Sequence, residues 1–117
     1  MIYYDQNPFT GRFRGRKVTV TVYPDRVEWA RKGPNIPLRN TGRHYRGLQL
    51  IDNVTGVTSV KDGFKTVVNV YTRSIRREVS GFRFTTSEVL NFRFAHEEAQ
   101  RFRTLLLHFM NVNREEH

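Results

Sequence analysis

The feature that constrains the fold most is a short alternating strand that runs directly into an amphipathic helix, between Glu88 and Met110. Leu90, Phe92 and Phe94 fall on one face of the predicted strand, because side chains alternate with a period of two. The apolar residues that follow recur at helical spacing, and they are Ala95, Ala99, Phe102, Leu105, Leu106, Phe109 and Met110. This pattern predicts a mainly β body that is capped by one C-terminal helix.

The length and composition indicate a single folded domain. The chain has 117 residues, 38% of them hydrophobic, which is enough for one core. It contains no cysteine, so disulfides, thiolate nucleophiles and cysteine-based metal sites are excluded. The N-terminus lacks the pattern of a signal peptide, and no apolar run reaches the roughly 20 residues of a membrane span. We therefore expect a cytoplasmic protein without a transmembrane segment.

The positive charge is concentrated in the front half of the chain. The net charge is +9, and residues 1–50 carry ten basic and three acidic residues, so they supply +7 of it. A basic surface of this kind attracts nucleic acid, anionic lipid or an acidic protein. Charge alone does not choose among these partners, and it is equally compatible with a solvated surface.

Two segments carry the candidate anion-binding residues. Residues 1–16 form a basic-aromatic N-terminal arm, which either contacts bases and phosphates or packs its aromatic rings on the domain or a neighbouring subunit. Residues 33–47 are rich in glycine and proline and predict a long surface loop, either functional or merely solubilising. The candidate residues for an anion or a partner are Arg12, Arg14, Arg16, Arg39, Arg43, His44 and Arg46, together with Lys32 at the edge of the loop.

The middle of the chain predicts about seven short antiparallel strands. Alternating valines over 17–23 and the alternating pair Val27 and Trp29 over 26–31, joined by a proline turn, predict a hairpin. Further strands are expected at 48–51, 57–60, 66–72, 79–85 and 89–94. We expect the Phe-Arg-Phe at 82–84 to pair with the Phe-Arg-Phe at 92–94 across a hairpin. The strands would form two packed sheets or an open barrel.

The sequence contains no arrangement that points to catalysis or to a cofactor. None of the four histidines has the spacing of a metal site, and no glycine-rich phosphate loop or nucleophile motif is present. Trp29 and the apolar face of the helix are expected to be core. We therefore predict no enzyme activity, no cofactor and no metal.

The order of elements resembles that of bacterial pleckstrin-homology-like (PH-like) domains over residues 17–112. The similarity lies in the hairpin at 18–29, in Leu50-Ile51-Asp52-Asn53-Val54-Thr55-Gly56-Val57, and in the closing strand and helix at 90–94 and 98–106. The resemblance implies two orthogonally packed antiparallel sheets with the C-terminal helix closing one open corner, no catalytic site, and a role in assembly. It does not imply phosphoinositide recognition, because the loop between the first two predicted strands is a tight turn here. A small free-standing domain would also suit a bacteriophage accessory protein that acts on a host component.

Two functions follow as hypotheses. The first is a protein-interaction or self-assembly module that forms a homo-oligomer or docks on a protein partner, for instance by adding a strand to a sheet edge. The alternative is a basic protein that binds nucleic acid or an anionic membrane surface. We expect the organisation to be an arm at 1–16, a PH-like domain at 17–112 and a tail at 113–117.

Overall fold

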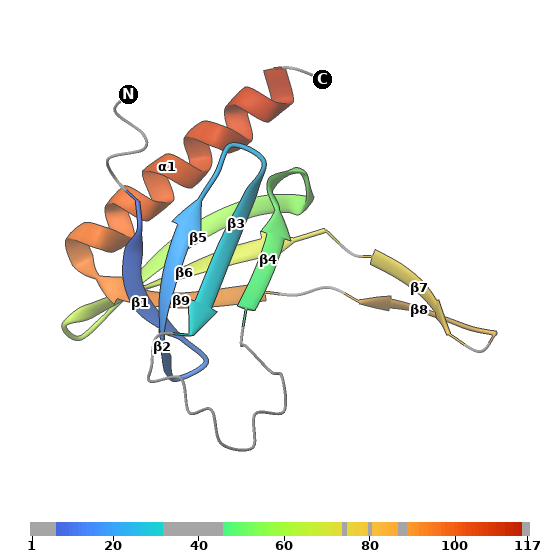
Figure 1. The fold of residues 1–117 in the computed structure, drawn as a ribbon, viewed down its shortest axis with the longest axis horizontal. Helices are drawn as coiled ribbons and strands as arrows, with labels where there is room; N and C mark the ends of the chain where they lie inside the picture. The colour runs from blue at the N-terminus through green and yellow to red at the C-terminus, as the bar shows by residue number, and fades with distance from the viewer. Residues whose placement is uncertain (1–6, 32–45, 74, 80, 87–88, 116–117) are drawn as a thin grey trace.

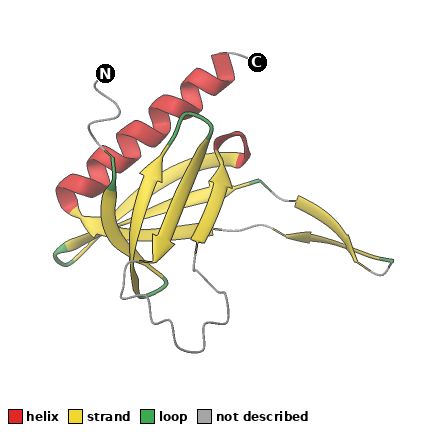
Figure 2. Cartoon of the chain, in the orientation of Figure 1, coloured by secondary structure: helices red, strands yellow, loops and turns green. Residues whose placement is uncertain are grey.

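The structure is a computed structural model that describes residues 7–31, 46–73, 75–79, 81–86 and 89–115. Within these ranges the chain is mainly β, with one short 3-10 helix and one long C-terminal α-helix (Figure 2). The elements in chain order are β1 (Phe9–Phe13), β2 (Arg16–Val22), β3 (Arg26–Arg31), β4 (Arg46–Leu50), η2 (Ile51–Asn53), β5 (Val54–Asp62), β6 (Lys65–Thr72), β7 (Ile75–Val79), β8 (Phe82–Thr86), β9 (Val89–Ala95) and α1 (His96–Glu115).

Seven of these strands form one antiparallel sheet that curls into a half-barrel (Figure 1). Their order is β4-β3-β2-β1-β9-β6-β5, so the two edge strands, β4 and β5, follow each other in the chain and are joined by η2. The predicted fold class is confirmed: the strands and the C-terminal helix match a PH-like arrangement. Of the two layouts expected for the strands, the structure has the open barrel, because one sheet runs through all seven strands.

The core lies between the concave face of the sheet and α1. Val18, Val20 and Val22 are buried along β2, as the alternation predicts. Phe102 of the helix contacts a cluster of rings, with centroids 5.7 Å from Phe9, 5.7 Å from Phe92 and 5.0 Å from Phe94. The helix also packs against β5, β6, β2 and η2. The helix therefore closes the half-barrel, and its apolar stripe from Ala99 to Met110 is core as expected. Ala95, which was expected to belong to this stripe, is the last residue of β9 and is exposed.

The N-terminal segment is part of the sheet and not an arm from residue 9 onward. Strand β1 pairs with β2 on one side and with β9 on the other, and Phe9 is fully buried. Before the strand, the Asn7 amide extends the pairing by accepting from the Val22 nitrogen at 2.8 Å and donating to the Val22 oxygen at 2.9 Å. The domain therefore begins before residue 17, and the predicted hairpin at 17–31 is β2–β3 rather than the opening hairpin.

The expected pairing of the two Phe-Arg-Phe segments is wrong. Strand β8 pairs with β7, with Phe82 opposite Val79, whereas β9 pairs with β6 and β1. Both edges of β9 are therefore occupied, so β8 has no edge of β9 to join. The β7–β8 hairpin extends away from the half-barrel instead (Figure 1).

The C-terminal boundary also differs from the expectation. The helix continues to Glu115, so residues 113–115 belong to α1 and not to a tail. Near the end of the helix, the Asn113 amide donates to the Pro24 oxygen at 3.0 Å, which ties the last turn to the β2–β3 connection. No helix in the described ranges is long and apolar enough to cross a membrane.

Candidate binding surfaces

The structure brings two of the predicted anion-binding residues into one groove. Arg12, Arg14 and Arg16 all lie at the β1–β2 connection and are exposed, and Arg12 and Arg14 line the groove. Arg46 is the first residue of β4, but its side chain is not part of the described structure. Lys32, Arg39, Arg43 and His44 lie outside the described residues, so their predicted role remains a prediction.

The β1–β2 turn holds an arginine in an unusual backbone conformation. Arg14 and Gly15 form a two-residue connection, with φ of 53° at Arg14 and 79° at Gly15. The left-handed conformation is costly for residues other than glycine, asparagine and aspartate, and it is often found at functional sites. The Arg12 guanidinium donates to the Gly15 oxygen at 3.3 Å, and that of Arg14 lies 5.0 Å from the Phe13 ring centroid. The turn therefore presents two arginines in defined positions.

Three cations lie directly opposite one another on the outer face of the sheet. Lys17 of β2 is opposite Arg12 of β1, which is opposite Arg93 of β9. Neighbouring strands are about 4.8 Å apart, and like charges directly opposite each other destabilise a sheet. Asp62 compensates part of the charge, with its Oδ2 atom 2.8 Å from Nη2 of Arg93. We call these three residues the basic row.

A groove runs beside the basic row on the same outer face. It has a volume of about 420 Å³ and is lined by Arg12, Arg14, Gly15, Val67, Asn69, Asn91 and Arg93. Asn69 and Asn91 are opposite each other on β6 and β9, so two amides lie next to the arginines. We call this the basic groove. Its lining can bind an anion through the guanidinium groups and form neutral hydrogen bonds through the amides.

Sequence reasoning missed Arg93, Lys17, Asn69 and Asn91 as members of this surface. The outward position of Arg93 follows from its place between the core residues Phe92 and Phe94. Arg93 lies next to Arg12 because β1 pairs with β9, and the sequence alone did not reveal this pairing. Arg26, in contrast, forms ion pairs within the protein. Its hydrogen bond with Asp25 raises the pKa of its guanidinium, and its Nε atom lies 3.3 Å from Oε2 of Glu28.

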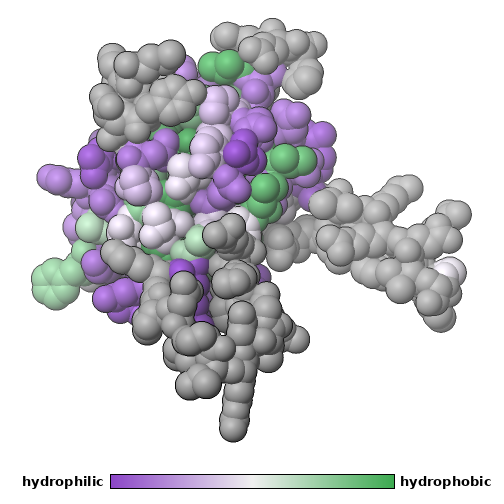
Figure 3. Space-filling view, in the orientation of Figure 1, coloured by the Kyte–Doolittle hydropathy of each residue, from purple (hydrophilic) through white to green (hydrophobic). Residues whose placement is uncertain are grey.

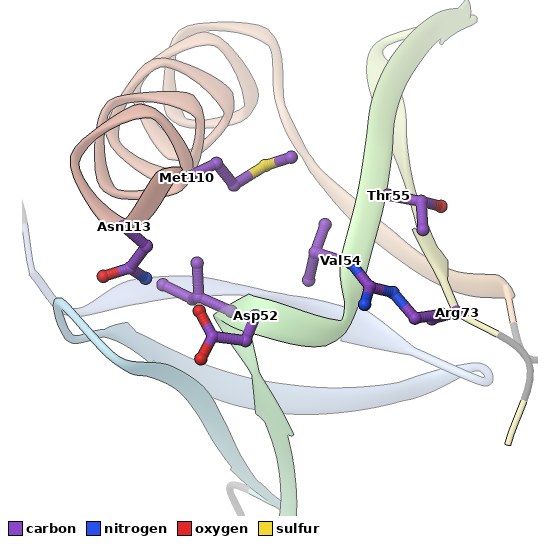
Figure 4. Close-up of a pocket in the computed structure, with 7 residues that line it drawn as sticks. Asp52, Val54, Thr55, Arg73, Met110 and Asn113 are labelled. Carbon is purple, nitrogen blue, oxygen red and sulfur yellow. The ribbon is translucent and has the colours of Figure 1, made fainter. Parts of the chain in front are cut away.

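A second pocket lies at the other end of the half-barrel, beneath the last turns of α1 (Figure 4). Its volume is about 640 Å³, and Met110 and Asn113 of the helix lie across it from Val54 and Arg73, whereas the side chain of Thr55 at its rim points away from the helix. Ile51 and Asp52 complete the lining, which contains a carboxylate and a guanidinium but no histidine or cysteine. Across the described part of the chain, no three His, Cys, Asp or Glu side chains are grouped as metal ligands.

Exposed sheet edges form the third kind of surface. Strand β4 is an edge of the half-barrel, and its outward-facing Leu48 and Leu50 are 53% and 47% exposed. Figure 3 shows that the visible face of the half-barrel is mostly hydrophilic, with small apolar patches. Strands β7 and β8 form a separate two-stranded sheet, so among the described residues each of them also has an edge that pairs with no strand.

The sequence comparisons with known proteins give no indication of function, so the function is argued from the geometry described above. No model of a protein family matches the sequence, and no curated protein matches it at a significant level.

Proposed function

We propose that this protein is a non-enzymatic self-assembly module in which the outer edge of β7 pairs with the same edge of a second copy. The observation that carries the proposal is the isolated β7–β8 hairpin. It pairs with no other strand among the described residues, and it extends away from the half-barrel (Figure 1). An isolated two-stranded sheet is marginally stable in water, and an unpaired edge is a template for another strand.

The sequence of β7 is complementary to itself. In an antiparallel pair centred on Arg77, Ile75 is opposite Val79 of the second copy, and Arg76 is opposite Glu78. The two apolar pairs and the two ion pairs are each favourable in a sheet, whereas the central Arg77 pair carries a like-charge cost. Strand β8, with the sequence Phe-Arg-Phe-Thr-Thr, has no acidic residue to oppose its arginine. The edge of β7 is therefore the preferred one.

Pairing two hairpins gives a four-stranded sheet in the order β8-β7-β7-β8. Such an interface is isologous and closes at two copies, as in most symmetric oligomers. Within each hairpin, the register places Ile75, Arg77, Val79, Phe82, Phe84 and Thr86 on one face of the ladder, so four apolar positions share this face with Arg77 and Thr86. A stable sheet needs three or more strands, and the four strands of the pair meet this number, whereas the two strands of one hairpin do not. Self-assembly therefore supplies what the isolated hairpin lacks.

Charge swaps on β7 test this proposal. Light scattering during size-exclusion chromatography should give twice the 13.9 kDa chain mass for the native protein. Arg76→Glu and Glu78→Arg should each place like charges opposite each other and shift the protein to monomer. The double variant has the native composition and restores both ion pairs, so it should restore the dimer.

The double variant is also the control for folding. Single variants that retain the native circular dichroism spectrum but lose the dimer support the proposal. A native protein that stays monomeric at all concentrations contradicts self-assembly, and in that case a different protein is the better candidate to occupy this edge. A double variant that stays monomeric while the native chain dimerises contradicts the register centred on Arg77.

A further inference from the structure

The outer face of β1, β9 and β6 presents cations, amides and an aromatic ring that have no role in self-assembly through β7. We propose that this face binds single-stranded nucleic acid, with phosphates along the basic row and bases over Asn69, Asn91 and Tyr71. The proposal is independent of the self-assembly proposed above, because it involves neither β7 nor β8. It rests on the sheet register, on the basic groove and on the order of the residues across the face.

The first argument is the unfavourable charge distribution of the basic row. Lys17, Arg12 and Arg93 occupy adjacent strands at directly opposed positions, with Asp62 as the carboxylate bound to Arg93. Arg14 adds a fourth cation at the edge of the same groove. Like charges at opposed positions lower the stability of the sheet. A polyanion that lies along the row would relieve this repulsion, because each phosphate compensates a cation and releases a counterion.

The second argument is that the residues beside the row suit bases. Asn91 and Asn69 are opposite each other, two residues along the strands from the basic row, which is a distance of about 7 Å. The Asn69 amide donates to the Thr58 hydroxyl at 3.3 Å, which orients it, and the Asn91 side chain is exposed. Carboxamide groups present both donors and acceptors, as base edges do. The amides therefore lie where a nucleotide bound by its phosphate to the row would place its base.

The third argument is an aromatic ring in the next row. Tyr71 of β6 lies opposite Val89 of β9, two residues beyond the Asn pair, and its side chain is 37% exposed. Its hydroxyl accepts from the Thr58 hydroxyl at 3.4 Å, which helps to fix the ring. Along the strands of this face, a row of cations is therefore followed by a pair of amides and then by an aromatic ring. Proteins that bind single strands combine a basic groove for the backbone with aromatic rings for the bases.

This arrangement favours a single strand over a duplex or a lipid surface. In a duplex the bases are stacked and paired inside the helix, so only the basic row would be used. A bilayer would likewise use the cations and leave the amides of Asn69 and Asn91 without partners. The concave groove of about 420 Å³ instead suits individual nucleotides.

Fluorescence anisotropy with a labelled oligo-dT of about 16 nucleotides tests the proposal. At about 50 mM salt the native protein should bind this strand at least tenfold more tightly than a duplex of equal length. The logarithm of the affinity should fall with the logarithm of salt with a slope of about −2, as expected for three phosphates of a single strand. Arg12→Gln should reduce that slope by about 0.7, whereas Arg103→Gln, on an exposed position of α1, should not.

Variants of Tyr71 separate base stacking from simple charge attraction. Tyr71→Leu should weaken binding about tenfold, and Tyr71→Phe, which keeps the ring, should bind like the native protein. Equal effects of Arg12→Gln and Arg103→Gln would overturn the assignment of the face. Equal binding to the duplex or to phosphatidylserine vesicles, no effect of Tyr71→Leu, or no binding at about 50 mM salt would overturn the single-strand proposal.

Discussion

Arg12 and Arg93 lie directly opposite each other across the pair of β1 and β9. Lys17 lies opposite Arg12 on the other side, so Arg12 has a cation on each neighbouring strand. A sheet selected for stability alone would place an acidic or neutral residue at this central position. These three like charges lie on the face that carries the basic groove, which is the reason we connect them with ligand binding.

Removing the charge of Arg12 should stabilise the protein while it weakens ligand binding. We expect Arg12→Gln to raise the free energy of unfolding by about 0.2–1 kcal/mol at low salt, because two like-charge contacts are lost. The gain should shrink at high salt, since exposed charges are screened. Urea denaturation at two salt concentrations measures this difference. A loss of stability at both salt concentrations would contradict the electrostatic explanation.

Phe9 should behave as a core residue although it lies close to the N-terminus. It is fully buried, and its ring centroid is 5.7 Å from that of Phe102. Phe9→Ala should therefore lower the free energy of unfolding by about 3–5 kcal/mol. Phe64→Ala is the matched control, because Phe64 is 93% exposed and its removal should change stability by less than about 0.5 kcal/mol. Equal effects of the two substitutions would contradict the placement of β1 in the sheet.

Gly47 should not tolerate a methyl group, because the Trp29 ring covers it. A Cβ atom on Gly47 would lie 2.0 Å from Cε2 of Trp29. Gly47→Ala should cost about 1–3 kcal/mol of stability and shift the fluorescence of Trp29, the single tryptophan. Gly56→Ala is the control, since a Cβ atom there meets nothing within 4 Å. Unchanged fluorescence and stability in Gly47→Ala would mean that the ring does not cover this position.

The sequence predicted the elements whose side chains alternate clearly. It missed β1, which glycine interrupts, and β7, whose charged centre is typical of a connection between strands. Strands β2, β3, β6 and β9 and helix α1 follow from their apolar periodicity. Strand β1 was assigned to an arm because Pro8, Gly11 and Gly15 suggested flexibility. Gly11 instead marks a close approach, since a Cβ atom there would lie 2.4 Å from Cδ1 of Phe94. Such a contact depends on tertiary packing and has no local signature.

The binding surface was only partly predictable for a similar reason. Arg12 and Arg14 were identified from their position among aromatic residues and glycines. Arg93 belongs to the same surface only because β1 pairs with β9, although the two strands are far apart in sequence. The repeated Phe-Arg-Phe segments suggested a hairpin between 82–84 and 92–94, but β9 is occupied by β6 and β1. Long-range pairing therefore determines both what the sequence analysis missed and what it assigned wrongly.

The most direct test of self-assembly is a disulfide between two copies at residue 77. The native chain contains no cysteine, so Arg77→Cys introduces a single thiol. In the proposed pair this residue is opposite itself, at a Cα separation of about 4.5–5.5 Å that a disulfide spans readily. Mild oxidation should therefore convert Arg77→Cys to a covalent dimer much faster than the control Arg83→Cys, which lies on β8. Equal and slow cross-linking of the two variants would contradict pairing through β7.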